Sequence, residues 1–130
     1  MTVLSIHSWT GQREQSEEVT DPTWADAESA LRRLDNRVTS QVGVETDAGD
    51  YVSVGGGDGR YHVVLGTADD DLFTLRGGAG AEDETAQLVV GGQLGNYPAD
   101  QVVDFDLAAR AVRTFLAEHS ADPDLDWLRE

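Results

Sequence analysis

QVGVETDAGDYVSV, the stretch from Gln41 to Val54, decides the predicted fold. On both sides of Asp47–Asp50, valines alternate with polar or small residues. Such alternation places every second side chain on one face of a β-strand, and a short run of Asp, Ala and Gly is typical of a turn. The stretch therefore predicts a β-hairpin with one apolar face.

The chain on both sides of this hairpin continues the pattern of short strands and turns. Further strands are predicted at Val3–Ile6, Arg60–Leu65, Leu72–Leu75 and Ala86–Val90. The connections between the later strands are too short for crossovers, so these strands are expected to pair antiparallel. The polar segment Gly11–Asp21 shows no apolar period and is predicted to be a loop.

A first helix is predicted after this polar segment. Asp21 suits its N-cap and Pro22 its first position. Apolar residues then recur in steps of three and four from Trp24 to Leu34, with Val38 as a further member of the same face. This spacing predicts an amphipathic helix.

A second helix is predicted near the C-terminus, capped by Asp104 or Asp106. Two adjacent apolar rows, one of them formed by Leu107, Ala111 and Phe115, give it a wide apolar stripe suited to covering a sheet. The dipeptide Asp122-Pro123 is expected to stop this helix. The apolar residues Leu125, Trp127 and Leu128 then predict a short anchoring tail.

Together these elements predict one domain over residues 1–130 with an α+β fold. Its core is expected to be a single curved, mostly antiparallel sheet of about five to six strands, with two helices packed on one face. The chain has no cysteine, which excludes disulfides and thiol chemistry. No apolar run approaches the ~18 residues of a membrane span. The N-terminal residues show neither the basic region nor the long apolar region of a secretory signal, so a cytoplasmic location is expected.

The charge of the chain is strongly one-sided. Its 25 acidic residues face only 9 basic ones, for a net charge of −16, and all the basic residues are arginines. Such a field repels nucleic acid and anionic lipid, so neither is expected as a partner. The acidity indicates a basic protein partner, a GC-rich genome or adaptation to high salt, and composition leaves these three open.

Patterns that would indicate chemistry are weak. The loop Gly55–Arg60 lacks the residues of a phosphate-binding loop and joins two strands. The alternating acids from Asp122 to Asp126 lack the glycine and the distal glutamate of a calcium loop. The histidines His7, His62 and His119 lie in separate elements without metal-ligand spacing. We therefore predict no catalytic residue, no metal site and no cofactor.

Two tyrosines stand out as recognition residues. Tyr51 is predicted on the outer face of its strand, and Tyr97 lies in Gly91–Pro98, which reads GGQLGNYP. Exposed tyrosine beside glutamine and asparagine is typical of protein interfaces. A tightly turned hairpin end explains the same segment equally well.

Several segments in this order carry a resemblance to a known family. They are Trp24 and Ala30–Asp35, Val52–Gly57, Val89–Pro98, Ala108–Leu116, Asp122-Pro123 and Trp127. The chain resembles actinobacterial immunity proteins of polymorphic toxin systems, a family often found beside deaminase-type toxins. It departs from the pattern at His119–Ala121, where a glycine is expected to close the helix.

The resemblance implies a non-enzymatic cytoplasmic protein that binds the C-terminal domain of one cognate toxin, a nucleic-acid deaminase, and occludes its active site. Short-range contacts are expected from Gln93, Asn96, Tyr97 and Tyr51. Electrostatic steering is expected from the acidic turns, which hold Asp47, Asp50, Asp58, Asp69, Asp70, Asp71, Glu82, Asp83 and Glu84. The alternative is a small-ligand-binding or enzymatic domain that uses the concave face of the sheet. The oligomeric state stays open.

Overall fold

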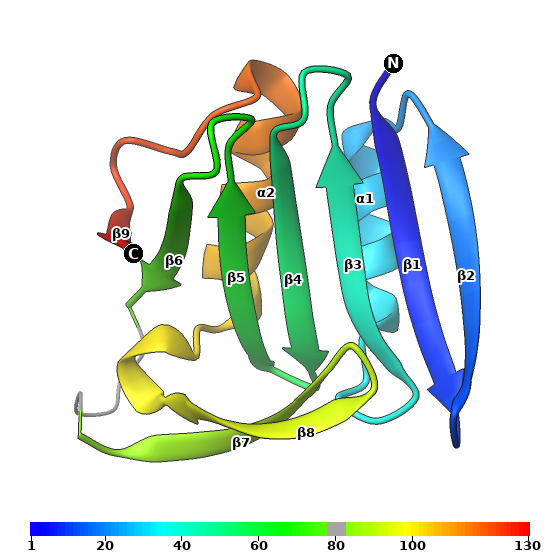
Figure 1. Ribbon diagram of the computed structural model, residues 1–130, viewed down its shortest axis with the longest axis vertical. Helices are drawn as coiled ribbons and strands as arrows, with labels where there is room; N and C mark the ends of the chain where they lie inside the picture. The colour runs from blue at the N-terminus through cyan, green and yellow to red at the C-terminus, as the bar shows by residue number, and fades with distance from the viewer. Residues whose placement is uncertain (78–82) are drawn as a thin grey trace.

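The computed structural model describes residues 1–77 and 83–130 as one large antiparallel sheet, a separate hairpin and two α-helices (Figure 1). The elements are β1 (Val3–Thr10), β2 (Arg13–Thr20), α1 (Trp24–Arg33), β3 (Thr39–Glu45), β4 (Tyr51–Gly57), β5 (Arg60–Gly66), β6 (Leu72–Arg76), β7 (Thr85–Val90), β8 (Gln93–Pro98), a 3₁₀ turn (Ala99–Gln101), α2 (Phe105–Glu118) and β9 (Asp126–Arg129). The large sheet has seven strands in the order β2-β1-β3-β4-β5-β6-β9.

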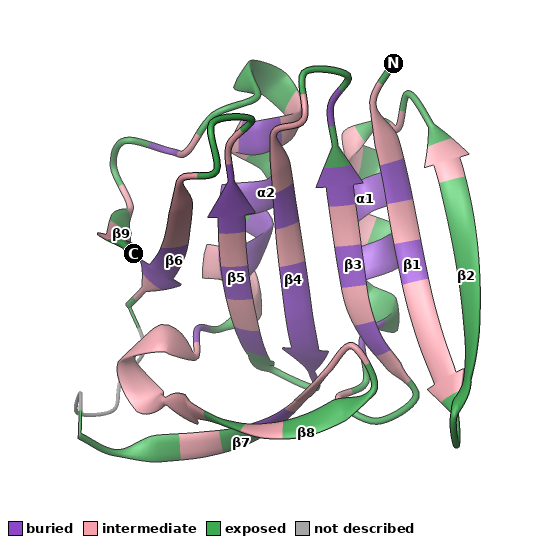
Figure 2. Ribbon diagram, in the orientation of Figure 1, coloured by how far each residue is buried: buried purple, intermediate pink, exposed green. Residues whose placement is uncertain are grey.

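The hydrophobic core lies between this sheet and the two helices, which cover one face of it (Figure 2). The alternating valines of the Gln41–Val54 stretch form the centre of the core, each about 1% exposed. Phe115 of α2 is the largest side chain that is completely buried against them. The predicted hairpin and the α+β class are thus confirmed, and the sheet is larger than the five to six strands expected.

The prediction of a loop at Gly11–Asp21 is wrong, because this segment contains β2. Gly11 and Gln12 form a two-residue turn, with Gly11 at φ +65°, and β2 then pairs with β1 along its full length. Every residue of β2 except Val19 is exposed. An edge strand takes its hydrogen bonds from one neighbour and needs no apolar alternation, so its sequence lacked the expected signal.

The first helix is shorter than predicted and has a different cap. Thr23, not Asp21, is the N-cap, and it forms a reciprocal capping box with Asp26. The helix ends at Arg33, because Asp35 Oδ1 accepts hydrogen bonds from the backbone N–H groups of residues 37, 38 and 39. Val38 therefore lies in the following loop, where it is 40% exposed.

The second helix begins at the predicted cap Asp104, but it ends at Glu118, before the expected stop at Asp122-Pro123. His119 closes it in the left-handed conformation, with φ +55°. A glycine is usual at such a position because it has no Cβ to clash, and here a histidine takes that role.

Asp122 instead holds the C-terminal segment against the helix. Its carboxylate accepts hydrogen bonds from Arg110, Thr114 and the backbone N–H of Asp124, while Trp127 Nε1 donates to its carbonyl oxygen. The backbone N–H of Asp124, followed by the Arg110 side chain, lowers the pKa of Asp122. The anchoring tail thereby becomes β9, which pairs with β6.

The strand at Ala86–Val90 does not belong to the large sheet. It is β7, which pairs only with β8 to form a separate two-stranded hairpin that crosses one end of the sheet (Figure 1). Within the described residues, no helix combines the length and the apolar character needed to cross a membrane.

Candidate functional site

The face of the sheet that the helices leave uncovered is organised in rows that run across the strands. The tyrosine row holds Val3, Glu45, Tyr51 and Gly66, the serine row holds Ser5, Gly43, Ser53 and Val64, and the histidine row holds His7, Gln41, Gly55 and His62. The residues between these positions on each strand are buried against the helices, so the three rows face away from them.

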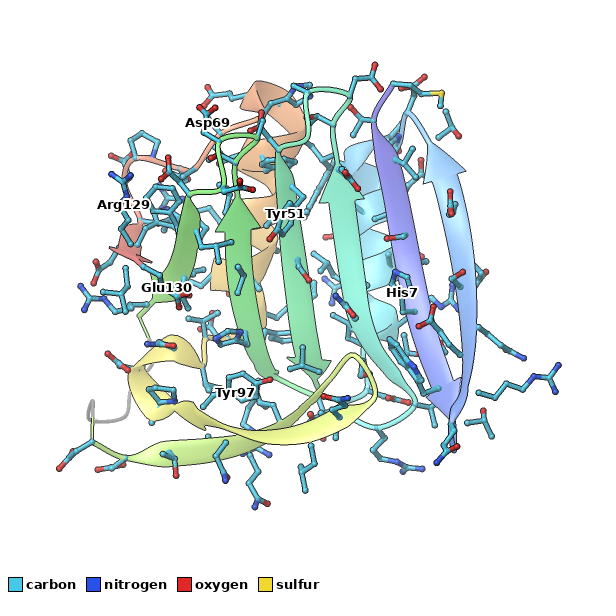
Figure 3. The ribbon with its side chains drawn as sticks, viewed as in Figure 1. His7, Tyr51, Asp69, Tyr97, Arg129 and Glu130 are labelled. Atoms are coloured by element: carbon cyan, nitrogen blue, oxygen red, sulfur yellow. The ribbon has the colours of Figure 1, made fainter. Side chains whose placement is uncertain are left out.

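The serine row projects least from the sheet surface, because Ser5, Gly43 and Ser53 carry small side chains or none. A groove of about 360 Å³ runs over it, between Glu45 and Tyr51 on one side and His7 and Gln41 on the other. Figure 3 shows His7 and Tyr51 on this open face. The groove is a consequence of strand register, which aligns Ser5, Gly43 and Ser53.

Hydrogen bonds and packing fix the walls of the groove. His7 places Nε2 at 3.2 Å from Ser5 Oγ and Nδ1 at 3.3 Å from Glu14 Oε1. Gln41 Nε2 donates to Ser53 Oγ at 3.1 Å. The Tyr51 ring lies over Gly66, where a Cβ atom would stand only 2.4 Å from it.

The β7–β8 hairpin borders the groove beyond the histidine row. Its backbone is held by Val89 N–H donating to Asn36 Oδ1 at 2.7 Å and by Gly92 N–H donating to Ser40 Oγ at 2.9 Å. Tyr97 packs on His62, with ring centroids 4.5 Å apart. The hairpin is thus an attached wall of the open face.

Glycines make this attachment possible. Val90 fills the space above Gly55, where a Cβ atom would lie 2.4 Å from Val90 Cγ1. At the tip, Gly91 and Gly92 both have positive φ, as a type I′ turn requires, and Trp9 packs on Gly92. The prediction of a tightly turned hairpin end is therefore confirmed.

The structure places the four predicted contact residues on different surfaces. Tyr51 and Tyr97 both lie on the open face, one on each side of the groove (Figure 3). Gln93 pairs with Val90 and shares the side of the hairpin that faces the sheet, whereas Asn96 pairs with Gln87 and lies on the opposite side. Both Gln93 and Asn96 are exposed.

The predicted acidic residues are also divided. The turns that hold Asp47, Asp50 and Asp69–Asp71 lie together at the end of the sheet opposite the hairpin (Figure 1). Asp50 joins the two turns by accepting from the Ala68 N–H, and Asp71 pairs with Arg129 at 2.7 Å. Asp69 and Asp70 are exposed.

The remaining acidic positions lie elsewhere. Asp58 is in the β4–β5 turn and lines a cavity with Arg32 and Arg37 of the α1 region. Asp83 and Glu84 precede β7 and are exposed, and Glu82 lies outside the described residues. The acidic positions that the structure describes therefore surround the sheet and do not form one cluster.

The negative charge lies mainly in the turns and loops. Each helix carries two arginines and two carboxylates, so the helices contribute no net charge. The strands together hold five carboxylates and four arginines, so nearly the whole net charge of −16 comes from the turns and loops. In the part of the chain that the structure describes, no three His, Asp or Glu side chains gather as metal ligands would.

Several residues of this site were not singled out from the sequence. Ser5, Gln41, Gly43 and Ser53 build the groove, and Trp9 supports the hairpin tip. Alternation around the buried valines already places Gln41, Gly43 and Ser53 on the outer face. The rows themselves depend on the registers of four strands, which no local pattern specifies.

His62 gives the open face a pH-dependent stability. Burial lowers its pKa, while Gln101 and the charge of Glu130 oppose this effect. Because the native state resists protonation, the unfolded chain gains a proton first as the pH falls below ~6.5, and the free energy of unfolding falls with it. Between pH ~7 and ~5, wild-type protein should lose more stability than His62→Gln in urea unfolding. Parallel pH profiles would contradict this.

An acidic α+β domain with one uncovered sheet face, a bordering hairpin and a groove is a domain built for binding. The chain matches the family model described as immunity protein Imm1 over residues 15–129, so it belongs to that family. The resemblance to immunity proteins is thereby confirmed, and the family supports a toxin-neutralising role. No curated protein matches the chain.

Proposed function

We propose that this immunity protein neutralises its toxin by covering the toxin's active site with the open face of the sheet and the β7–β8 hairpin. The observation that carries the proposal is the position of the charge, since the helices are neutral and the turns and loops around the sheet hold nearly the whole excess of carboxylates. Complementary potentials steer partners together, so the partner surface is basic.

The toxin that fits this surface acts on nucleic acid, and the resemblance indicates a deaminase. Enzymes of nucleic acid need a basic path for the phosphate backbone. Base deaminases also need a snug pocket for the target base, which an inhibitor can block. An open sheet face bordered by acidic turns and laid over that path competes with the substrate. The immunity protein itself performs no chemistry in this mechanism.

The hairpin supplies the short-range contacts in this proposal. Leu94 is 67% exposed, and Asn96 follows on the same side of the hairpin. An exposed apolar side chain beside polar donors and acceptors is suited to an interface centre. Tyr97 acts with them by holding the hairpin on His62.

The test is the affinity of the purified toxin domain for hairpin variants. The toxin is first isolated by pull-down with the tagged protein, and its activity on a single-stranded oligonucleotide containing cytosine and adenine is recorded. Truncating hot spots costs about 2 kcal/mol or more, so Leu94→Ala combined with Asn96→Ala should raise Kd at least ~30-fold in calorimetry.

The matched control is Glu118→Ala, an exposed polar truncation on α2, which should leave Kd unchanged. Loss of affinity in the control alone would place the toxin on the helix layer and reject the proposed face. Strand cleavage in place of base conversion would reject the deaminase target.

A further inference from the structure

The groove over the serine row has a chemistry that the surrounding acidity does not explain. It offers the Glu45 carboxylate, the hydroxyl oxygens of Ser5 and Ser53, and the ring of Tyr51. Among the described residues that line it, none is an arginine. The groove therefore offers two hydroxyl oxygens as hydrogen-bond acceptors and a negative charge at its rim.

Among the described lining residues, His7 is the one other ionisable side chain besides Glu45 and Tyr51, and both of its ring nitrogens have partners. Its Nδ1 lies 3.3 Å from Glu14 Oε1, and its Nε2 lies 3.2 Å from Ser5 Oγ. A cation entering the groove thus meets a histidine whose ring nitrogens already have partners. The Glu14 carboxylate, on the far side of His7, adds a second negative charge near the groove.

The aromatic wall is packed against the sheet. Tyr51 opens β4 directly opposite Glu45 of β3, and its ring is packed down over Gly66. Any side chain at Gly66 would overlap the ring, because a Cβ atom there would stand 2.4 Å from Tyr51 Cε1. A preformed ring beside a carboxylate loses little entropy on binding, and cations bind over such rings.

The size of the groove selects a side chain. Its volume of about 360 Å³ is near the lower limit of the ~300–1,000 Å³ range of small-molecule sites. A guanidinium group is flat, carries five donors and stacks on aromatic rings, whereas an ammonium group is compact and strongly hydrated. A narrow groove with one aromatic wall and several separate acceptors suits the guanidinium group.

Building on the proposed function, we propose that this groove receives an arginine side chain of the toxin. The guanidinium group lies against Tyr51, pairs with Glu45 and donates to the hydroxyl oxygens of Ser5 and Ser53. The groove is then the anchor point for a basic active-site path, and the hairpin supplies the neighbouring contacts.

The first experiment needs no toxin. N-acetyl-arginine-N-methylamide is titrated into ¹⁵N-labelled protein, with the uncharged citrulline analogue as the matched probe. Saturable amide shifts at Gln41, Gly43 and Ser53 are expected with the arginine probe and not with citrulline. Equal shifts with both probes, or shifts that spread over the acidic turns without saturating, would overturn the inference.

Two variants and a control locate the probe. Gly43→Val fills the floor, and it should fold because a Cβ at Gly43 meets only ordinary contacts and valine favours strands. It should abolish saturable binding. Glu45→Gln should weaken binding at least tenfold, whereas Glu118→Gln removes the same charge from α2 and should not. Binding that persists in Gly43→Val or in Glu45→Gln would overturn the inference.

The toxin then separates this inference from the proposed function. If the hairpin variants lose toxin affinity while Gly43→Val and Glu45→Gln keep it, the groove inference fails and the proposed function stands. If the arginine probe occupies the groove but toxin binding responds only to substitutions on the helices, the proposed function fails. Loss of toxin affinity in the hairpin variants and in the groove variants supports the proposed function and the groove inference together.

Discussion

Replacing Asp47, Asp69 and Asp70 with asparagine should slow association with the toxin about tenfold at low ionic strength. These carboxylates lie in the two turns at one end of the sheet and are exposed. Asp70 has φ +66°, a conformation that asparagine also adopts readily, so the turn is retained. The dissociation rate should change little, because exposed charges act mainly during the encounter.

The choice of positions keeps the hydrogen bonds that join the turns, and it removes one exposed ion pair, between Asp47 and the N-terminal amine of Met1. Asp50 accepts from the Ala68 N–H and Asp71 pairs with Arg129, so both stay unchanged. Association is measured by stopped-flow fluorescence at several salt concentrations, and the difference should shrink as salt screens the field.

The control removes three charges from the helix layer through Glu28→Gln, Asp106→Asn and Glu118→Gln. Association that slows equally in both triple variants would show that net charge alone matters and would contradict steering toward the sheet. If the acidity instead serves salt adaptation, stability should rise steeply from low to molar salt while association is unaffected by either set.

Phe115→Ala should lower the free energy of unfolding by about 3–5 kcal/mol. The Phe115 side chain is completely buried at the centre of the helix–sheet interface, so its removal leaves a cavity. That loss is a large part of the stability of a domain of this size. Urea unfolding followed by circular dichroism measures the change.

Leu116→Ala is the comparison within the same helix, because Leu116 is only partly buried at the edge of the core. It should cost clearly less than Phe115→Ala. Equal losses would mean that the cavity at Phe115 collapses or that the core is not centred there.

The elements with strong local periodicity were predictable from sequence. The alternating valines from Val42 to Val54 and the apolar rows of α2 each bury one face against the same core, so local pattern and tertiary position agree. β2 was not predicted, because it is held as a strand mainly by its hydrogen bonds to β1 and not by an apolar alternation of its own. The C-terminal end of α1 was predicted too late in the chain, because the Asp35 side chain accepts hydrogen bonds from three backbone N–H groups that follow it.

The candidate site was less predictable than the fold. Alternation was enough to place Tyr51 on the outer face, and composition was enough to mark Tyr97. The groove needed the alignment of Ser5, Gly43 and Ser53 from three strands. The docking of the hairpin needed Gly55 under Val90, a contact between residues far apart in the chain. Such long-range contacts leave no periodic trace in the sequence.

The separate β7–β8 hairpin also has an evolutionary consequence. Its inward side is committed to the sheet through Leu88, Val90 and Tyr97, whereas its outward side carries Gln87, Val89, Leu94 and Asn96. Substitutions on the outward side leave the core untouched and cost little stability. The lineage can therefore change this small set of side chains to follow a diverging toxin while the folded scaffold is inherited unchanged.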